Sequence, residues 1–198
     1  EKSTSDLARL MIGRDLPTYI RAEYQGIPET CFQVENLGYQ SDDPFGVSLQ
    51  NINLSVQAGE IVGIAGISGN GQAELLSLLS GEALTKTGRL YLEQQEITAL
   101  TAGQRRNVGL GFVPEERLGR GAVPNMTLAQ NALLTAYRQK FTRWGLIKFS
   151  DIQTFAEKII KKFGVKASGA NAEARSLSGG NLQKFIVGRE ILQNPKFL

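Results

Sequence analysis

The sequence predicts an α/β fold, in which a mixed β-sheet carrying a glycine-rich loop is followed by an α-helical subdomain. Three observations predict it. Apolar and polar residues alternate over residues 47–56, a short apolar run at residues 60–65 leads into glycines, and helical periodicity prevails after residue 127. The composition agrees, because 41% hydrophobic and 21% charged residues are typical of a globular domain rather than a disordered chain.

The first 30 residues differ from the rest of the chain. Apolar side chains at helical spacing predict a short amphipathic helix over residues 4–14. Residues 15–30 contain two prolines and no periodicity, so they are expected to be a linker. We therefore place a boundary near residue 29, with a helix and linker in residues 1–29 and the main domain in residues 30–198.

Strands are expected directly after this boundary. Residues 31–37 begin the strand pattern, and the alternation over residues 47–56 slips by one at Gln50 and Asn51. Such half-buried alternation favours an antiparallel pair with an irregularity at the slip.

The next segment is expected to be a strand, a loop and a helix. The apolar run at residues 60–65 suits a strand buried on both faces, and the leucines of residues 73–79 suit a buried helix. Residues 88–92 predict a second strand, and residues 108–113 a third that ends at Pro114.

Helices are expected to dominate the second half of the chain. One is predicted over residues 127–138, and Ser150 and Gln153 predict a capping box ahead of another. Together these form a helical subdomain over about residues 120–176. A last helix is expected to open at the glycine pair that ends with Gly180.

The composition also excludes several kinds of site. The chain has no histidine and a single cysteine, Cys31, so it cannot build a Ser-His-Asp or Cys-His centre, a zinc site or an internal disulfide; no metal site is expected from its own side chains. The net charge of +3 without a clustered patch does not favour nucleic acid. No run approaches the ~18 apolar residues that would span a bilayer, so we expect neither export nor membrane insertion.

A glycine-rich loop is the first candidate site. Residues 66–73 fit the frame of a P-loop, although Gln72 and Ala73 stand where that frame has Lys and Ser or Thr. Backbone amides of such a loop and the start of the next helix can hold phosphate without side chains. Loss of the lysine costs roughly 1.5–3 kcal/mol, so binding could survive but hydrolysis at this loop is not expected. Taken alone, the loop also fits a tight glycine turn that packs a strand on a helix. The candidate phosphate-binding residues are Gly66, Ser68, Gly69, Asn70, Gly71, Gln72, Ala73 and Glu74.

A second glycine pair is the other candidate. Ser178, Gly179 and Gly180 open a helix about a hundred residues later, followed by Asn181. Exposed amides at a helix N-terminus form an anion cradle. A single Ser-Gly-Gly of this kind also fits a plain helix cap.

The two motifs together resemble the ATP-binding cassette family over residues 31–198. Residues 66–73 look like a degenerate Walker A motif, and residues 177–183 look like the signature motif of that family. Residues 111–117 are similar to the segment around the Q-loop, with Glu115 where most members have glutamine. These runs resemble the importers of simple sugars and nucleosides, in which the second of two fused cassettes has an altered Walker A.

The resemblance implies a fold and a mechanism. The fold would be a P-loop NTPase (RecA-like) core with an antiparallel β-subdomain and an α-helical subdomain, and residues 1–29 would be the tail of a first cassette. ATP would lie between the Walker A of one cassette and the signature motif of the other. Ser178, Gly179, Gly180 and Asn181 would then grip the γ-phosphate of ATP held by the first cassette.

The resemblance also implies cofactors and partners. ATP and Mg²⁺ would be bound in the full assembly, which would pair with transmembrane permease subunits and, through them, a substrate-binding protein at the cytoplasmic face of the membrane. Tyr39 would stack on adenine, with Phe45 as the other candidate, and Glu115 would sense the phosphate. Trp144 could be either a docking aromatic or a core residue.

No catalytic residue is assigned within this segment. In the family, the Walker B carboxylate and the switch histidine should follow a segment like residues 193–198, so the segment alone is expected to be inactive. The alternative function is a nucleotide-binding regulatory module without turnover. A soluble cassette that acts on DNA or ribosomes would need a basic groove or long charged insertions, and the sequence has neither. The sequence does not indicate which cargo is transported, because in the family other subunits bind the cargo.

Overall fold

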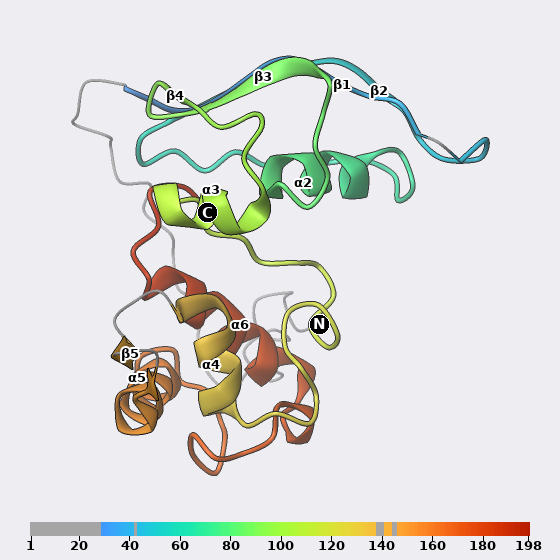
Figure 1. Cartoon of the computed structure of the whole chain (residues 1–198). Helices are drawn as coiled ribbons and strands as arrows, with labels where there is room; N and C mark the ends of the chain where they lie inside the picture. Colours follow the sequence, from blue (N-terminus) through green and yellow to red (C-terminus); the bar gives the residue numbers. More distant parts are fainter. Residues whose placement is uncertain (1–28, 42, 138–140, 144–145) are drawn as a thin grey trace, which may run out of the picture.

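The computed structural model describes residues 29–41, 43–137, 141–143 and 146–198. The helix expected over residues 4–14, the linker after it and Trp144 lie outside the described residues. The described chain has two layers: a β-sheet with two short helices beneath it, and a group of helices below those (Figure 1).

The described sheet is antiparallel throughout, which confirms the antiparallel pair predicted after the boundary but not the mixed sheet that the sequence predicted as a whole. Its strands are β1 (Thr30–Tyr39), β2 (Leu49–Gln57), β3 (Thr87–Leu92) and β4 (Gln95–Glu96), in the order β2-β1-β3-β4. The predicted slip in β2 is confirmed: the β1–β2 register shifts on both sides of the Leu37–Ile52 pair, and Asn51 has a φ of 52°.

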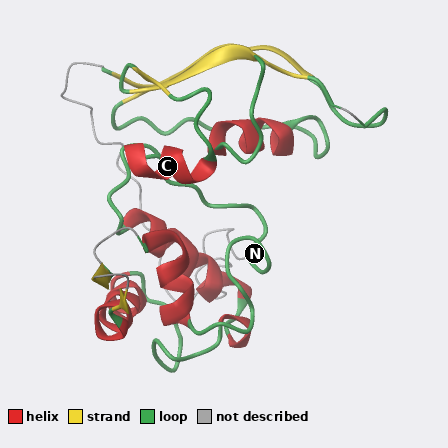
Figure 2. Ribbon diagram, viewed as in Figure 1, coloured by secondary structure: helices red, strands yellow, loops and turns green. Residues whose placement is uncertain are grey.

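A first core lies between the sheet and its helices. Beneath the sheet lie α2 (Gln72–Ser80) and α3 (Ala102–Val108), and Figure 2 shows no helix on the opposite face of the sheet. The alternation of β1 explains this, because Phe32 and Val34 are buried while Gln33 between them is not. The buried members of this core are Phe32, Val34, Leu37, Val56, Leu78, Leu90, Leu92, Ile97 and Leu110.

The helical layer has its own core. It comprises α4 (Leu128–Ala136), α5 (Phe149–Lys162), the 3₁₀ turn η1 (Ala174–Ser176) and α6 (Gly179–Ile191), together with the small hairpin of β5 (Thr142–Arg143) and β6 (Leu146–Ile147). Its buried residues are Ala122, Leu128, Ala132, Ala156, Ile159, Val165, Ala170, Ala174, Leu182, Phe185 and Ile186. Of the helices described, none combines the length and the apolar character that crossing a bilayer requires.

The end of the chain ties the two layers together. After α6 it returns to the sheet layer, where the C-terminus lies beside α3 (Figure 1). Phe197 stacks on Phe32 of β1 with ring centroids 4.2 Å apart and forms a parallel bridge with Leu110. Arg106 of α3 also reaches Glu190 of α6, with 2.5 Å between Nη1 and Oε2.

Two strand predictions are wrong. Residues 60–65 form no strand and are exposed, with Ile61 97% exposed, and Val108 is the last residue of helix α3 rather than the start of a strand. Strands buried on both faces need hydrogen-bonded neighbours. Among the described residues, no strand pairs with residues 60–65, and Leu110 has only its single bridge to Phe197.

The predicted capping box at Ser150 is also wrong. Helix α5 begins at Phe149 with Lys148 at its N-cap, so Ser150 lies inside the first turn, where its hydroxyl contacts Asp151 instead. The capping boxes of the described helices are Thr101 with Gln104 and Thr127 with Gln130.

Candidate functional site

The glycine-rich loop leads directly into α2, as predicted. Gly69 and Gly71 have φ values of 87° and 97°, in the left-handed region that favours glycine. Gly71 is packed against the side chain of Leu49 in β2, whereas residues 68–70 are exposed. The loop therefore presents an exposed turn at the positive end of a nine-residue helix.

The side chain of Gln72 folds back over this loop. Its Oε1 accepts a hydrogen bond from the backbone N–H of Asn70 at 3.1 Å, and its Nε2 donates to the carbonyl oxygen of Ile67 at 3.0 Å. The Nε2 atom also lies 2.2 Å from the position that a Cβ atom would take at Gly66. The amide of Gln72 thus fills the space that glycine leaves at residue 66.

The loop offers few groups for a magnesium ion. Ala73 is an exposed methyl group without an oxygen, and the Glu74 carboxylate is the only acidic group in the first turn of α2. Within the described ranges, no three His, Cys, Asp or Glu side chains gather to form a metal site. The loop by itself does not match the oxygen-rich coordination that Mg²⁺ needs.

Tyr39 lies close to the loop in the sheet. It is half-buried at the end of β1 and pairs with Leu49, the residue whose side chain touches Gly71. Phe45, the other candidate for an adenine contact, is 97% exposed in the turn between β1 and β2. The described contacts therefore connect Tyr39 to the loop.

The second glycine pair lies at the N-terminus of α6, as predicted. Ser178 is the N-cap, and Gly180 is exposed with no other atom within 4 Å of its Cβ position. Asn181 has a structural role here: its Nδ2 donates to Ser178 Oγ at 2.9 Å, and its Oδ1 accepts from the Lys166 backbone N–H at 2.9 Å. Asn181 therefore orients the serine and holds the N-terminus of α6 against the preceding segment.

Arg117 is a further candidate site residue, which the sequence analysis does not predict. Its Nη1 lies 3.1 Å from the Cβ position of Gly179, and none of the hydrogen bonds or ion pairs described for the chain involves its side chain. A cation is unfavourable at the positive end of a helix unless an anion lies nearby. In the sequence, only the position of Arg117 two residues after Glu115 could have indicated a role. Glu115 itself is exposed.

The backbone fixes the loop that carries Arg117. The Arg117 carbonyl accepts from Ala122 N–H at 2.8 Å, and the Cβ position of Gly121 lies 2.9 Å both from that carbonyl and from Ile186 of α6. A residue larger than glycine would not fit between the loop and the helix. The loop is therefore held against α6, which keeps Arg117 beside Gly179.

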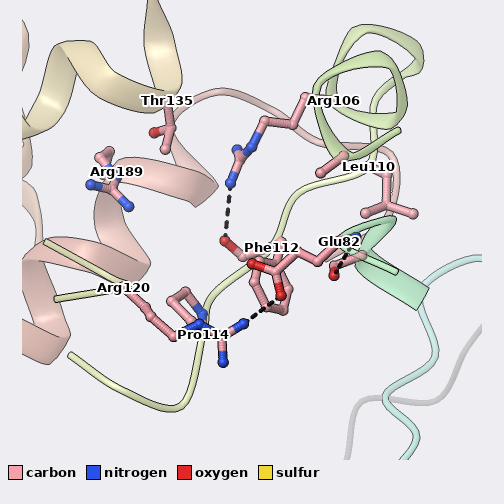
Figure 3. A pocket seen from close by; sticks show the side chains of 10 residues that line it. Glu82, Arg106, Leu110, Phe112, Pro114, Arg120, Thr135 and Arg189 are labelled. Atoms are coloured by element: carbon pink, nitrogen blue, oxygen red, sulfur yellow. Dashed lines mark hydrogen bonds and ion pairs between the residues drawn. The ribbon is translucent and has the colours of Figure 1, made fainter. Parts of the chain in front are cut away.

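A cavity of about 160 Å³ lies between the two layers (Figure 3). It is lined by residues of α3, of the segment before Arg117 and of the helical layer, and its charged lining residues are three arginines and one glutamate. Arg120 pairs with Glu82, and Arg106 donates to the Phe112 carbonyl at 3.2 Å. The lining residues are Ser80, Glu82, Ala102, Arg106, Leu110, Phe112, Pro114, Arg120, Thr135 and Arg189.

The structure does not bring the two glycine motifs together. The first lies on α2 in the sheet layer, and the second on α6 in the helical layer (Figure 1). No hydrogen bond or ion pair among the described residues joins residues 66–73 to residues 177–183.

Comparisons with known proteins agree with the family resemblance that the sequence shows. The family model described as ABC transporter matches residues 49–198. The chain is 34% identical over its whole length to the nucleoside import ATP-binding protein NupA of Lactococcus lactis, 35% to the guanosine import ATP-binding protein NupO of Bacillus subtilis, and 31% over 98% of its length to the ribose import ATP-binding protein RbsA of Chromobacterium violaceum. It spans 39%, 39% and 37% of these relatives.

Solved structures support the fold. The chain is similar to the ATP-binding cassette MJ0796 in a post-hydrolysis dimer with ADP and Pi, with a TM-score of 0.68 and 22% identity over 83% of this chain and 70% of that one. It is also similar to the ADP form of the cassette MJ1267, with a TM-score of 0.64 and 21% identity over 84% of this chain and 66% of that one. The predicted P-loop NTPase fold with an antiparallel β-subdomain and helices is therefore confirmed, and the chain belongs to the ABC transporter family.

Proposed function

We propose that this chain is part of the ATP-binding subunit of an importer of simple sugars or nucleosides, and that its main contribution is the phosphate clamp at the start of α6. The observation that carries the proposal is the open N-terminus of α6, where Gly180 leaves free space and Arg117 lies against Gly179 with no anionic partner among the described residues. Exposed amides and an adjacent guanidinium are suited to the terminal phosphate of a nucleoside triphosphate.

The clamp would act on a nucleotide held elsewhere. Because the two glycine motifs lie on different layers, α6 would meet ATP bound by a first cassette of the same polypeptide, with residues 1–29 as the tail of that cassette. The loop at residues 66–73 would bind a second nucleotide weakly, since Gln72 and Ala73 supply neither a charge nor an oxygen ligand for Mg²⁺. Tyr39 would stack on the adenine of that second nucleotide.

The cavity between the layers supports a permease partner. Segments on both sides of Glu115 and the helical layer line it, so a cytoplasmic helix of a permease subunit that lay across these segments and inserted one side chain into the cavity would touch both layers. The assembly would then lie at the cytoplasmic face of the membrane and receive cargo from a substrate-binding protein. The relatives named for nucleoside, guanosine and ribose import support nucleosides or simple sugars as the class of cargo.

The substitution Gly180→Ala in the full polypeptide with its permease tests the clamp. A Cβ atom at this position meets nothing within the chain, so the folding stability should stay unchanged or rise, because alanine favours helices. A phosphate needs that space, so ATP turnover should fall by about tenfold or more. Gly103→Ala, which is equally open on α3, is the matched control and should retain turnover. Full turnover of Gly180→Ala would exclude the clamp.

A regulatory module without turnover is the second candidate, and the folded-back side chain of Gln72 favours it. In that case the full polypeptide would bind ATP but hydrolyse none, with or without its permease. The assay above separates the two functions, because under the regulatory proposal the wild-type polypeptide has no ATP turnover that Gly180→Ala could reduce. This chain alone is expected to hydrolyse no ATP under either proposal.

A further inference from the structure

We propose that Gln72 is an internal ligand of the glycine-rich loop that competes with phosphate, so that a nucleotide binds there only after the Gln72 side chain has swung out. The inference rests on the proposed function of this loop as a second nucleotide site and assigns a regulating residue to it. We call the side chain of Gln72 with its two loop partners, Asn70 N–H and the Ile67 carbonyl, the Gln72 latch.

The latch binds both a hydrogen-bond donor and a hydrogen-bond acceptor of the loop backbone. A phosphate group accepts hydrogen bonds and donates none at neutral pH, so it can use the Asn70 N–H but not the Ile67 carbonyl. The carboxamide of Gln72 has one acceptor and one donor end, and it satisfies both groups at 3.1 and 3.0 Å. The loop is therefore complementary to a neutral amide as it stands.

Gly66 makes room for the latch. The Gln72 Nε2 atom lies 2.2 Å from the Cβ position of Gly66, a distance that no side chain at residue 66 could allow. In the same loop, the Cβ position of Gly69 has no atom within 4 Å. The Gln72 side chain thus occupies the space beside Gly66, while the space beside Gly69 stays open.

A residue that closes the loop in this way has the opposite effect from a phosphate ligand. Removal of a side chain that binds phosphate weakens nucleotide binding, whereas removal of a side chain that competes with phosphate strengthens it. In the second case the nucleotide no longer has to break the hydrogen bonds that stabilise the empty loop. For two exposed hydrogen bonds, the expected gain in affinity from Gln72→Ala is about tenfold.

Hydrogen exchange in the full polypeptide tests the latch, read from the peptides that cover residues 66–72 so that other nucleotide sites do not interfere. Without nucleotide, Gln72→Ala should accelerate exchange at the Asn70 amide. Gly66→Ala should do the same, because the new methyl group must expel the flexible side chain. Gln33→Ala, a matched change on β1 where the amide donates to Glu35, should leave this exchange unchanged.

An ATP titration of the same peptides gives the second readout. The concentration of ATP that half-protects the loop should fall about tenfold in Gln72→Ala. Unchanged exchange at Asn70 in both variants, or a need for more ATP in Gln72→Ala, would overturn the latch. If neither the wild type nor Gln72→Lys is protected by ATP, the loop is not a nucleotide site and the proposed second site fails, while the exchange without nucleotide still decides whether the latch exists.

Discussion

Arg105 of α3 is a buried cation that pairs with no carboxylate in the part of the chain that the structure describes. Its guanidinium donates to four carbonyl oxygens, those of Leu78, Leu79, Thr98 and Leu100, at 2.5–3.0 Å. Leu78 and Leu79 lie in the last turn of α2, where carbonyls lack partners within the helix and the dipole favours a positive charge. Burial lowers the pKa of Arg105 from its ordinary value, because loss of water disfavours the charged guanidinium, and the four carbonyls and the helix end offset part of that cost.

Arg105→Met should lower the free energy of unfolding by about 3 kcal/mol or more, because the carbonyls at the end of α2 would be buried without donors. Urea denaturation of the 198-residue chain measures this. Arg89→Met on the exposed surface of β3 is the control and should change the stability by less than about 0.5 kcal/mol. An equally small effect at Arg105 would mean that water reaches those carbonyls.

Arg117, unlike Arg105, should matter for ATP turnover and not for stability. Its guanidinium lies at the positive end of α6, so Arg117→Ala should leave the stability unchanged or raise it by up to about 1 kcal/mol. If the guanidinium contacts phosphate in the proposed clamp, the ATP turnover of the full polypeptide should fall about tenfold or more, with a partial return in Arg117→Lys. Loss of stability together with turnover would instead indicate a purely structural role.

A cluster of ion pairs between helices α3 and α6 connects the two layers. Glu190 is 1% exposed and holds two guanidinium groups, Arg106 at 2.5 Å and Arg189 at 2.9 Å. Arg189 also donates to the Asn131 carbonyl of α4, and burial lowers its pKa although Glu190 acts to raise it. Helix α6, which begins at Gly179 in the proposed clamp, therefore ends in a charged cluster beside the cavity between the layers.

Glu190→Gln should destabilise the chain by about 3–5 kcal/mol, because two guanidinium groups would lose their shared carboxylate. Thermal unfolding should then broaden or divide into two transitions, since each layer has its own hydrophobic core. In the double variant with Arg106→Met, part of the loss should return. A single sharp transition with unchanged midpoint would show that the ion pairs do not join the layers.

The elements that the sequence predicted well have their signal in local periodicity. Helix α5 and strand β2 show their apolar faces directly, and Asn51 marks the slip in register. The N-cap of α5 was misplaced because its start depends on the fold of the preceding segment, where Lys148 N–H donates to the Phe141 carbonyl. Side-chain contacts leave no such pattern in a single sequence, whether they join distant residues, as Arg117 and Gly179, or residues of one loop, as Gln72 and Gly66.

Among the described residues, the two cores leave the apolar segment at residues 61–67 without cover. Ile61, Ile64 and Ile67 are 97%, 56% and 78% exposed, although the same run of residues predicted a strand buried on both faces. An apolar run specifies a buried strand only where neighbouring strands satisfy its backbone, and none of the strands described here lies beside it. Exposed apolar surface of this kind favours association.

The double variant Ile61→Thr with Ile64→Thr should therefore leave the stability of the 198-residue chain within about 0.5 kcal/mol per site, as expected for exposed positions. It should also reduce binding of a hydrophobic dye and self-association in sedimentation, because less apolar surface meets water. Leu78→Thr in α2, where the side chain is 1% exposed, provides the contrast and should cost about 2–5 kcal/mol. If the double variant lost as much stability as Leu78→Thr, residues 60–65 would be packed in this chain, and the strand predicted from the sequence would be the better description.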